Sequence, residues 1–217
     1  MNFQKKLLTL SFRNMVFLPL CYAAPIAYYC YLVNFDCEVE IFANYTKQTL
    51  ANRCYIATSQ GVQSLIIPVE RPKEKCLIKD IKISNHSDWQ TLHWRAIKTA
   101  YNSTPFFDFY ADELIKLYKK KTDFLLDFDV NLQIVIKNLL HYQNVNFLLS
   151  NNYKNIINKN DLDLRNLLLS KKKNVNLPFI LKEYYQVFSD KFGFQENLSI
   201  FDLLFNMGNE SRIYLKV

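Results

Sequence analysis

The spacing of apolar residues changes partway along this chain, and that change limits the folds open to it. Before Ser87, short apolar runs alternate with polar residues, which is typical of strands. From Ser87 onward, apolar residues recur every three to four positions, which is typical of one buried helix face. Strands followed by helices bury both apolar faces by packing together. The sequence therefore predicts an α/β fold, with a mixed β-sheet formed mainly by the N-terminal half, flanking helices and a helical C-terminal portion.

The strand prediction rests on short apolar or alternating segments bounded by turn residues. The expected strands are residues 16–18, 38–42, 53–58, 62–67, 77–83 and 145–149. Gly61 can supply the positive φ of a hairpin turn between the third and fourth segments, and Pro68 ends the fourth. A short aromatic helix is expected at 26–33, directly after Pro25.

Helix boundaries are predicted from capping residues. Ser87, with Gln90 three residues later, fits a capping box for a helix through Tyr101. Further helices are expected after Thr104, as the cap, and from a cap near Asp129. A last helix is expected from about residue 199 to 207, ending before glycine.

The chain is long enough for one sizeable core, with 217 residues of which 50% are hydrophobic and 22% charged. We expect an N-terminal extension at 1–14 and a single domain at 15–217. Residues 150–176 are rich in Asn and Lys and are predicted to be irregular or mobile. No charge-free and proline-free stretch is long enough for a membrane span, and Arg13 and Asn14 interrupt the apolar run of a signal-like start.

Charge and cysteine content point to the class of partner and the compartment. The formal net charge of +7 favours an anionic small molecule, such as a nucleotide-sugar or an activated acyl donor. Nucleic acid is not the expected partner, because no binding motif or basic face is visible and the one dense basic run is 171–173. Five cysteines without a C-x-x-C pair predict reduced thiols, a cytoplasmic protein and no metal site.

Several families of enzyme are excluded by missing motifs. The three glycines of the chain, Gly61, Gly193 and Gly208, lie too far apart to form a G-x-G-x-x-G fingerprint or a phosphate-binding P-loop. The chain also lacks a G-x-S-x-G elbow and an H-E-x-x-H pair. The residues consequently indicate no particular cofactor.

The segment 44–53, which reads N-Y-T-K-Q-T-L-A-N-R, is the main candidate for chemistry. It joins two expected strands and carries Asn44, Tyr45, Lys47, Asn52 and Arg53. Functional groups often lie on such connections. Lys and Arg could hold an anion while the amides orient polar groups. The alternative is a solvated loop whose charges only face water.

Two other candidates have structural alternatives. His93 could act as a general base, but its place on an apolar helical stripe favours a buried, hydrogen-bonded side chain. Ser199 and Asp202 could be a nucleophile and its partner, but S-x-x-D also fits the start of the last helix.

The order of several motifs, from about residue 16 to 215, resembles the WbqC-like family. The motifs are Asn44-Tyr45-x-Lys47, Asn52-Arg53, Ile67-Pro68-Val69, Trp89 with His93-Trp94, Ala100-Tyr101 before Pro105-Phe106-Phe107, Leu198-Ser199-Ile200-x-Asp202 and Phe205-Asn206-x-Gly208. The chain departs from the family pattern twice. It has Pro19-Leu20 where many members open with Gln-Pro, and Ile41-Phe42-Ala43 where members carry acidic residues.

The resemblance implies a transferase in cell-surface polysaccharide (O-antigen) biosynthesis, with transfer of glycine or another acyl group onto an amino sugar. The expected catalytic residues are Tyr45 and His93. The expected substrate-binding residues are Asn44, Lys47, Asn52, Arg53, Trp94, Tyr101, Asp202 and Asn206. The alternative is a non-catalytic ligand-binding or scaffold protein of the same fold, which the departures from the pattern favour.

Overall fold

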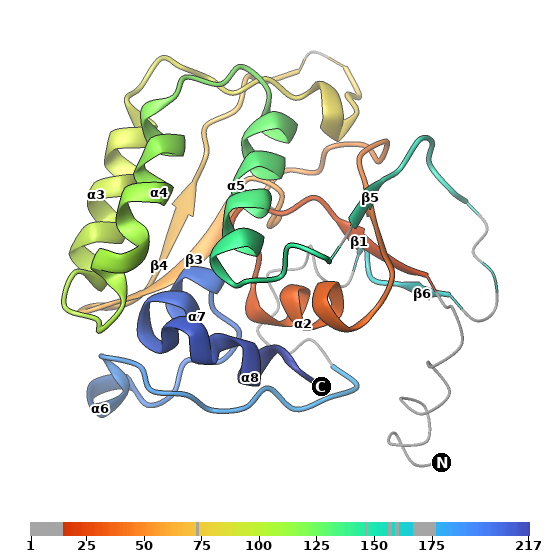
Figure 1. The fold of residues 1–217 in the computed structure, drawn as a ribbon. Helices are drawn as coiled ribbons and strands as arrows, with labels where there is room; N and C mark the ends of the chain where they lie inside the picture. Colours follow the sequence, from red (N-terminus) through yellow and green to blue (C-terminus); the bar gives the residue numbers. More distant parts are fainter. Residues whose placement is uncertain (1–14, 73, 146, 156–157, 159–160, 167–176) are drawn as a thin grey trace.

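Four short parallel strands form the main sheet of the computed structural model, which describes residues 15–217 except 73, 146, 156–157, 159–160 and 167–176 (Figure 1). The strands lie in the order β5-β2-β1-β6 and run parallel throughout. Their bounds are β1 Val16–Pro19, β2 Cys37–Glu40, β5 Phe147–Leu149 and β6 Leu162–Asp163. Every residue of β1 and β2 is buried, as expected for strands in the interior of a parallel sheet.

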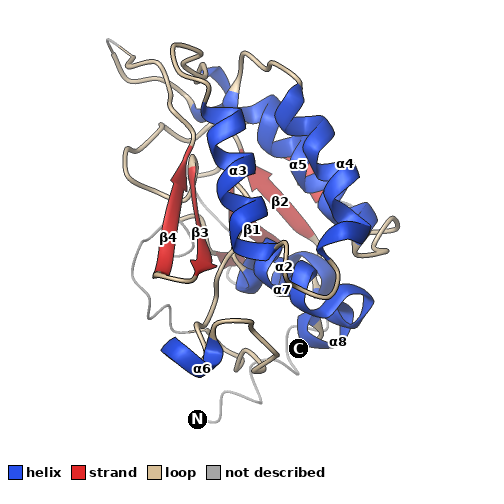
Figure 2. Cartoon of the chain, turned by 90° about the vertical axis from the view of Figure 1, so that its left-hand side faces the viewer, coloured by secondary structure: helices blue, strands red, loops and turns tan. Residues whose placement is uncertain are grey.

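An antiparallel hairpin, β3 (Arg53–Thr58) and β4 (Gly61–Ile66), stands beside the helix α3 and apart from the parallel sheet (Figure 2). The predicted turn is confirmed, because Thr58 pairs with Gly61 and Gly61 has φ +104°. Cys54 and Ile56 are buried on one face of β3, while Arg53 and Tyr55 on the other face are half-buried.

Three helices form a layer in which α4 packs between α3 and α5 (Figure 1). Their bounds are α3 Trp89–Tyr101, α4 Phe107–Lys119 and α5 Leu125–Leu139. The remaining helices are α2 Ile26–Asn34, α6 Ser189–Phe192, α7 Ile200–Met207 and α8 Ser211–Leu215, with short 3₁₀ turns η2 Ile78–Asp80 and η3 Gly208–Glu210. The α/β prediction is confirmed, with a parallel four-stranded sheet plus an antiparallel pair and a helical C-terminal portion.

The last helix begins and ends as predicted, whereas three other helix starts differ. Ser199 caps α7, and Gly208 follows it with φ +54°. Asp88, not Ser87, caps α3 by accepting a hydrogen bond from the Thr91 amide. The Thr104 hydroxyl donates to the Tyr101 carbonyl instead of capping α4. The helix α5 begins four residues before Asp129, because the apolar stripe already includes Leu125.

The predicted strand at 77–83 is wrong. The amides of Ile78 and Lys79 bond the carbonyls of Ala43 and Ile41, while the Asp80 amide turns back to Leu77. That turn makes the 3₁₀ helix η2, so the segment crosses the chain after β2 without forming a ladder.

The segment 150–176, predicted to be irregular, contains an edge of the sheet. The two residues of β6 pair with β1 through Val16–Leu162 and Phe17–Asp163. Two residues of a longer irregular segment carry too little pattern to predict a strand. Parts of this segment (156–157, 159–160 and 167–176) and the predicted extension 1–14 lie outside the described residues.

Two further observations concern the whole described chain. No helix among the described residues is long and apolar enough to cross a membrane. All five cysteines are free thiols, and only Cys76 is not fully buried.

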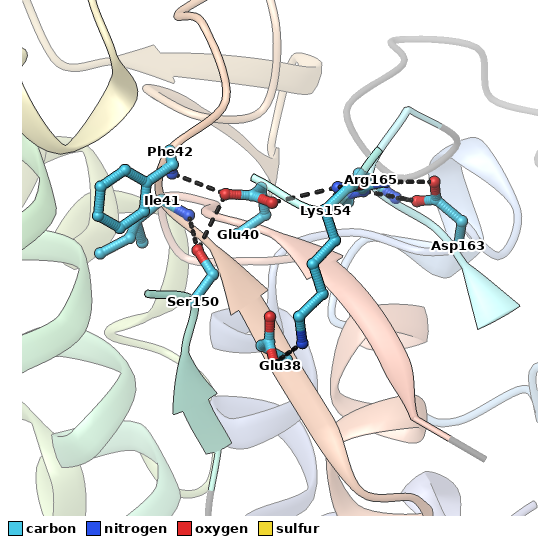
Figure 3. A network of polar contacts seen from close by, with 8 residues as sticks. All are labelled: Glu38, Glu40, Ile41, Phe42, Ser150, Lys154, Asp163 and Arg165. Carbon is cyan, nitrogen blue, oxygen red and sulfur yellow. Dashed lines mark hydrogen bonds and ion pairs between the residues drawn. The ribbon is translucent and has the colours of Figure 1, made fainter. Parts of the chain in front are cut away.

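A polar network around the buried charges of Glu40 and Arg165 joins the carboxyl ends of three strands (Figure 3). Glu40, at the end of β2, is 2% exposed and accepts hydrogen bonds from the Phe42 amide (2.7 Å) and the Ser150 hydroxyl (2.9 Å). Its other oxygen accepts from Arg165 Nη1 at 3.1 Å. Arg165 also donates from Nε and Nη2 to the two oxygens of Asp163 at 2.9 and 2.8 Å. The network fixes the residues after β5 and β6 to the end of β2.

We expect Arg165→Met to lower the free energy of unfolding by about 3–5 kcal/mol, because it leaves the Glu40 carboxylate buried without a counter-charge. Urea unfolding measures the change. Lys116→Met is the matched control, since it breaks an exposed ion pair with Glu113 and should change stability by less than about 1 kcal/mol. Equal effects of the two substitutions would show that the Arg165 network does not hold the sheet.

Candidate functional site

The candidate site lies at the carboxyl ends of the parallel strands, where ligands bind in open α/β sheets. Two connections leave this edge: residues 20–25 after β1 and residues 41–52 after β2. They touch each other, because the Tyr22 amide donates to the Leu50 carbonyl at 3.0 Å. The polar segment 44–53 therefore lies against the connection that follows the first strand.

Lys47 and Arg53 are the two cations of this segment. Lys47 is exposed, and Arg53, the first residue of β3, is half-buried. Neither side chain has a hydrogen bond or an ion pair within the described part of the chain, and the buried Nε of Arg53 is an unpartnered donor. By contrast, every nitrogen of the Arg165 guanidinium is hydrogen-bonded. An anion is the natural partner for an unpaired, half-buried guanidinium.

The two predicted amides are placed differently. Asn44 is exposed and forms an isolated bridge with Leu77. Asn52 is buried. Its side-chain amide donates to the backbone carbonyl of Ile67 at 2.8 Å, and its backbone carbonyl accepts from the backbone amide of Ile67 at 2.9 Å. Asn52 thus joins the start of β3 to the residue after β4. That contact fixes the backbone beneath Arg53.

Tyr45 is half-buried near Arg53. Burial raises the pKa of its phenol, and the nearby guanidinium of Arg53 partly offsets that rise. At neutral pH the phenol is therefore protonated and can donate a hydrogen bond to a ligand held by Arg53. The structure thus brings the predicted site residues Tyr45 and Arg53 near each other.

His93, on α3, is buried, and both of its ring nitrogens have partners. Nδ1 lies 2.9 Å from the Tyr22 hydroxyl, and Nε2 lies 3.1 Å from the Ile66 carbonyl. Since a carbonyl can only accept, Nε2 carries the proton and Nδ1 accepts from Tyr22, whose hydroxyl also lies 2.7 Å from that of Tyr118. Burial lowers the pKa of His93 to about 4, so the ring is neutral at pH 7.

Trp94 and Tyr101 lie elsewhere on α3. Trp94 is half-buried and packs against Phe107 and Tyr118 of α4, at ring-centroid distances of 6.0 and 5.8 Å. Tyr101 is buried, and its hydroxyl donates to Asp202 at 3.0 Å while accepting from the Ala57 amide at 3.2 Å. Tyr101 therefore links α3, β3 and α7.

Asp202 and Asn206 lie on α7 in a second buried polar cluster. The Asp202 carboxyl accepts from Tyr101, from the Tyr184 hydroxyl (2.5 Å) and from the Gln186 amide (2.7 Å). Burial raises its pKa, and the three donors partly offset the rise. Asn206 donates to the Asp202 backbone carbonyl at 2.7 Å. These contacts occupy Asp202 within the protein, so its geometry favours a role in the fold.

The predicted residues thus form three groups around β3. Tyr45 and Arg53 lie at its start, and His93 bonds the carbonyl of Ile66, the residue paired with Arg53. Tyr101, Asp202 and Asn206 lie at its other end, near Ala57. The first two groups adjoin one another, whereas the third is separate.

Sequence reasoning missed Asp129, Glu40 and Arg165. Asp129 was interpreted as a helix cap, although it lies four residues before Gln133 on one face of α5 and both are buried. A carboxylate inside an apolar helical stripe is itself a signal of a special site. Glu40 ends a strand, C-E-V-E, that alternates polar and apolar residues, so the sequence carries no comparable signal of its burial.

Replacing His93 with Gln should lower the free energy of unfolding by about 1–3 kcal/mol at pH 7, because one of the two buried hydrogen bonds of the His93 ring, to Tyr22 or to the Ile66 carbonyl, is lost. The pKa of His93 falls from 6.5 to about 4 on folding, so the unfolded chain binds the extra proton between those values. Wild-type stability therefore decreases as the pH falls through this range, and its advantage over His93→Gln should narrow.

Chemical unfolding at pH 7, 5.5 and 4 measures this change. His86→Gln is the control, since His86 is exposed. A stability difference that does not vary with pH would contradict a buried, neutral His93.

Comparison with known proteins places the chain in a family. The model of the WbqC-like protein family matches residues 32–177, which is more than half of the chain. An uncharacterized protein of Mycobacterium tuberculosis (strain ATCC 25618 / H37Rv), Rv1507c, is 26% identical over 207 residues, covering 79% of this chain and 84% of the relative. No solved structure gives a significant match. From the extent of the family match, we conclude that this chain belongs to the WbqC-like protein family.

Proposed function

We propose that this protein is a cytoplasmic group transferase that binds an anionic activated donor beside Arg53 and transfers an acyl or aminoacyl group to an amino sugar of a cell-surface polysaccharide. The observation that carries the proposal is the Arg53 guanidinium at the start of β3, whose buried Nε has no partner, in the segment that follows the carboxyl end of β2. Burying a charge without a partner is costly, and a bound phosphate or carboxylate would remove that cost.

Electrostatics supports an anion at this position. Arg53 has the Tyr45 phenol nearby, and Lys47 extends from the same segment without an ion pair among the described residues. The net charge of +7 attracts an anion to the protein as a whole. In the proposed complex, Arg53 binds the anionic group in two parallel hydrogen bonds, Lys47 adds charge, and Tyr45 donates a hydrogen bond.

The transfer chemistry and the link to polysaccharide rest on likeness to the WbqC-like family. The cytoplasmic location rests on the five free cysteines.

A second candidate function is ligand binding without catalysis. It is favoured by His93, whose ring nitrogens are both bonded within the protein and whose neutral form is stable down to about pH 4. A general base needs a free nitrogen near the proton it removes. In this alternative Arg53 would hold an anion in the same way, and no group would be transferred.

The anion site is tested by calorimetric titration with UDP-N-acetylglucosamine, acetyl-coenzyme A and inorganic phosphate. Arg53→Lys should weaken binding of the anion that the wild type prefers by about tenfold to a hundredfold, equivalent to about 1.5–3 kcal/mol. The substitution keeps the charge and removes only the paired geometry of the guanidinium. Stability should change by no more than about 0.5 kcal/mol.

Arg95→Lys, on the exposed face of α3, is the matched control and should leave binding unchanged. If Arg53→Lys binds every tested anion as wild type does, Arg53 does not form the site. Binding that depends on Arg53, without product formation from any donor and amino-sugar pair, would favour the second candidate.

A further inference from the structure

The carboxyl of Asp129, on α5, is buried without a partner. The residue is 1% exposed, and neither carboxyl oxygen has a hydrogen bond. Native proteins pair nearly all buried polar groups, so a carboxyl with two unpartnered oxygens needs an explanation. No part of the fold described above uses this group.

The polar groups around Asp129 are nearly all paired. One turn later on α5, the Gln133 amide donates to the Tyr28 hydroxyl at 3.1 Å. The Tyr22 hydroxyl lies within hydrogen-bond distance of His93 and Tyr118. The exception is the Trp89 indole N–H, which is also unpartnered. Trp89 packs edge-on against Phe128, the residue before Asp129, with ring centroids 5.1 Å apart. The unpartnered indole donor therefore packs against the residue that precedes Asp129 on α5.

Among the described residues, no positively charged group interacts with Asp129. The titratable groups that interact with it are Cys21 of the β1–α2 connection, Tyr29 of α2, Cys54 of β3, Tyr118 of α4 and Tyr22. None of these is a cation. Burial is the cause that raises the pKa of Asp129 well above its usual value, so the carboxyl is favoured in its protonated form.

We propose that Asp129 binds the amino group of the acceptor on which this protein acts. An ammonium group would supply both the missing counter-charge and N–H donors for the two free oxygens. Tyr22, which interacts with Asp129, packs against Phe128, and Phe128 packs against Trp89. This inference rests on the proposed function for the identity of the acceptor as an amino compound.

The position of Asp129 in the fold supports a ligand role. Cys21 and Tyr22, which interact with it, follow β1 directly at the ligand-binding edge of the sheet. Cys54 and Arg53 are neighbours on β3 with side chains on opposite faces. Asp129 therefore lies on the inner side of that strand and Arg53 on the outer side, and because Arg53 is the first residue of β3, a ligand that passes the start of the strand would reach both side chains.

The transfer step follows from the pairing of the Asp129 carboxyl with the ammonium group of the acceptor. When the ammonium binds, the protonated Asp129 releases its own proton to solvent and forms an ion pair as the carboxylate. The carboxylate then accepts one proton from the bound ammonium and becomes a neutral acid again, which leaves the nitrogen lone pair free. That lone pair attacks the carbonyl carbon of the activated acyl donor. A C–N bond forms, the bond from the carbonyl carbon to the leaving group breaks, and the leaving group departs with its electron pair and takes up the proton that the new amide nitrogen loses. The raised pKa of Asp129 brings it closer to that of an amine, which eases the proton transfer.

The premise is tested by comparing two buried aspartates, of which Asp202 has three donors and Asp129 none. The unfolded chain ionises Asp129 above pH 3.8, whereas the folded chain keeps it protonated, so wild-type stability decreases as the pH rises. Asp129→Asn has no carboxyl to protonate, so its stability should not decrease with rising pH in this way. The melting temperature at pH 7 should rise by at least about 2 °C, and the gain should shrink towards pH 4. Asp202→Asn should lower the melting temperature instead.

The ligand role is tested by thermal shift with glucosamine, glucose and N-acetylglucosamine at equal concentration. Glucosamine should stabilise the wild type more than the other two, which lack a free amino group. In Asp129→Asn this preference should disappear. The variant should still bind the anion at Arg53 with the affinity of the wild type. The anion titration tests the Arg53 site and glucosamine tests the Asp129 site. A negative result at one site therefore does not count against the other.

Three outcomes would overturn the proposal. Destabilisation by Asp129→Asn at pH 7, or failure of that variant to fold, would mean that the carboxylate has a partner within the protein. Equal stabilisation of the wild type by glucosamine and glucose needs no variant and would exclude the amino-group preference. A preference for glucosamine that persists in Asp129→Asn would place the amine elsewhere.

Discussion

The ion pair between Glu40 and Arg165 is the interaction on which the arrangement of the sheet depends. A carboxylate that is 2% exposed cannot remain charged without a counter-ion, and the guanidinium comes from the segment after β6. The same guanidinium binds Asp163 with two hydrogen bonds, so β6, with only two residues, stays on the sheet through side chains as much as through its ladder. The positions of β1, of the β1–α2 connection and of the loop it contacts follow from this pairing.

The candidate site depends on that framework but has the opposite electrostatic character. At Arg165 each nitrogen has a partner, whereas Arg53 has an unpartnered buried nitrogen and Asp129 has two unpartnered oxygens. A protein tolerates such unpaired groups where a ligand supplies the partner, and it satisfies the others internally. The difference between the two arginines and between the two buried aspartates therefore separates groups that hold the fold from groups that we assign to ligands.

The sequence predicted the strongly periodic parts of the fold and none of the long-range polar pairs. The hairpin turn at Gly61 and the last helix, capped by Ser199, were correct because local residues determine them. The segment 77–83 was misassigned because its alternating pattern is local, whereas its hydrogen bonds go to residues after β2. For the site, the sequence located the polar segment 44–53, but the unpaired state of Arg53 and the burial of Asp129 depend on residues far along the chain.

The separation along the chain between β1 and β6 has a consequence for folding. The Met15 amide bonds the Asp161 side chain, 146 residues away, and the β1–β6 pairing closes nearly the same loop. Contacts of such long separation carry a large loop-closure entropy and form slowly. During synthesis, Glu40 emerges from the ribosome about 125 residues before Arg165, as their sequence separation of 125 shows. We therefore expect the nascent N-terminal half to expose one unpaired edge of β1 until β6, at residues 162–163 of 217, has been made.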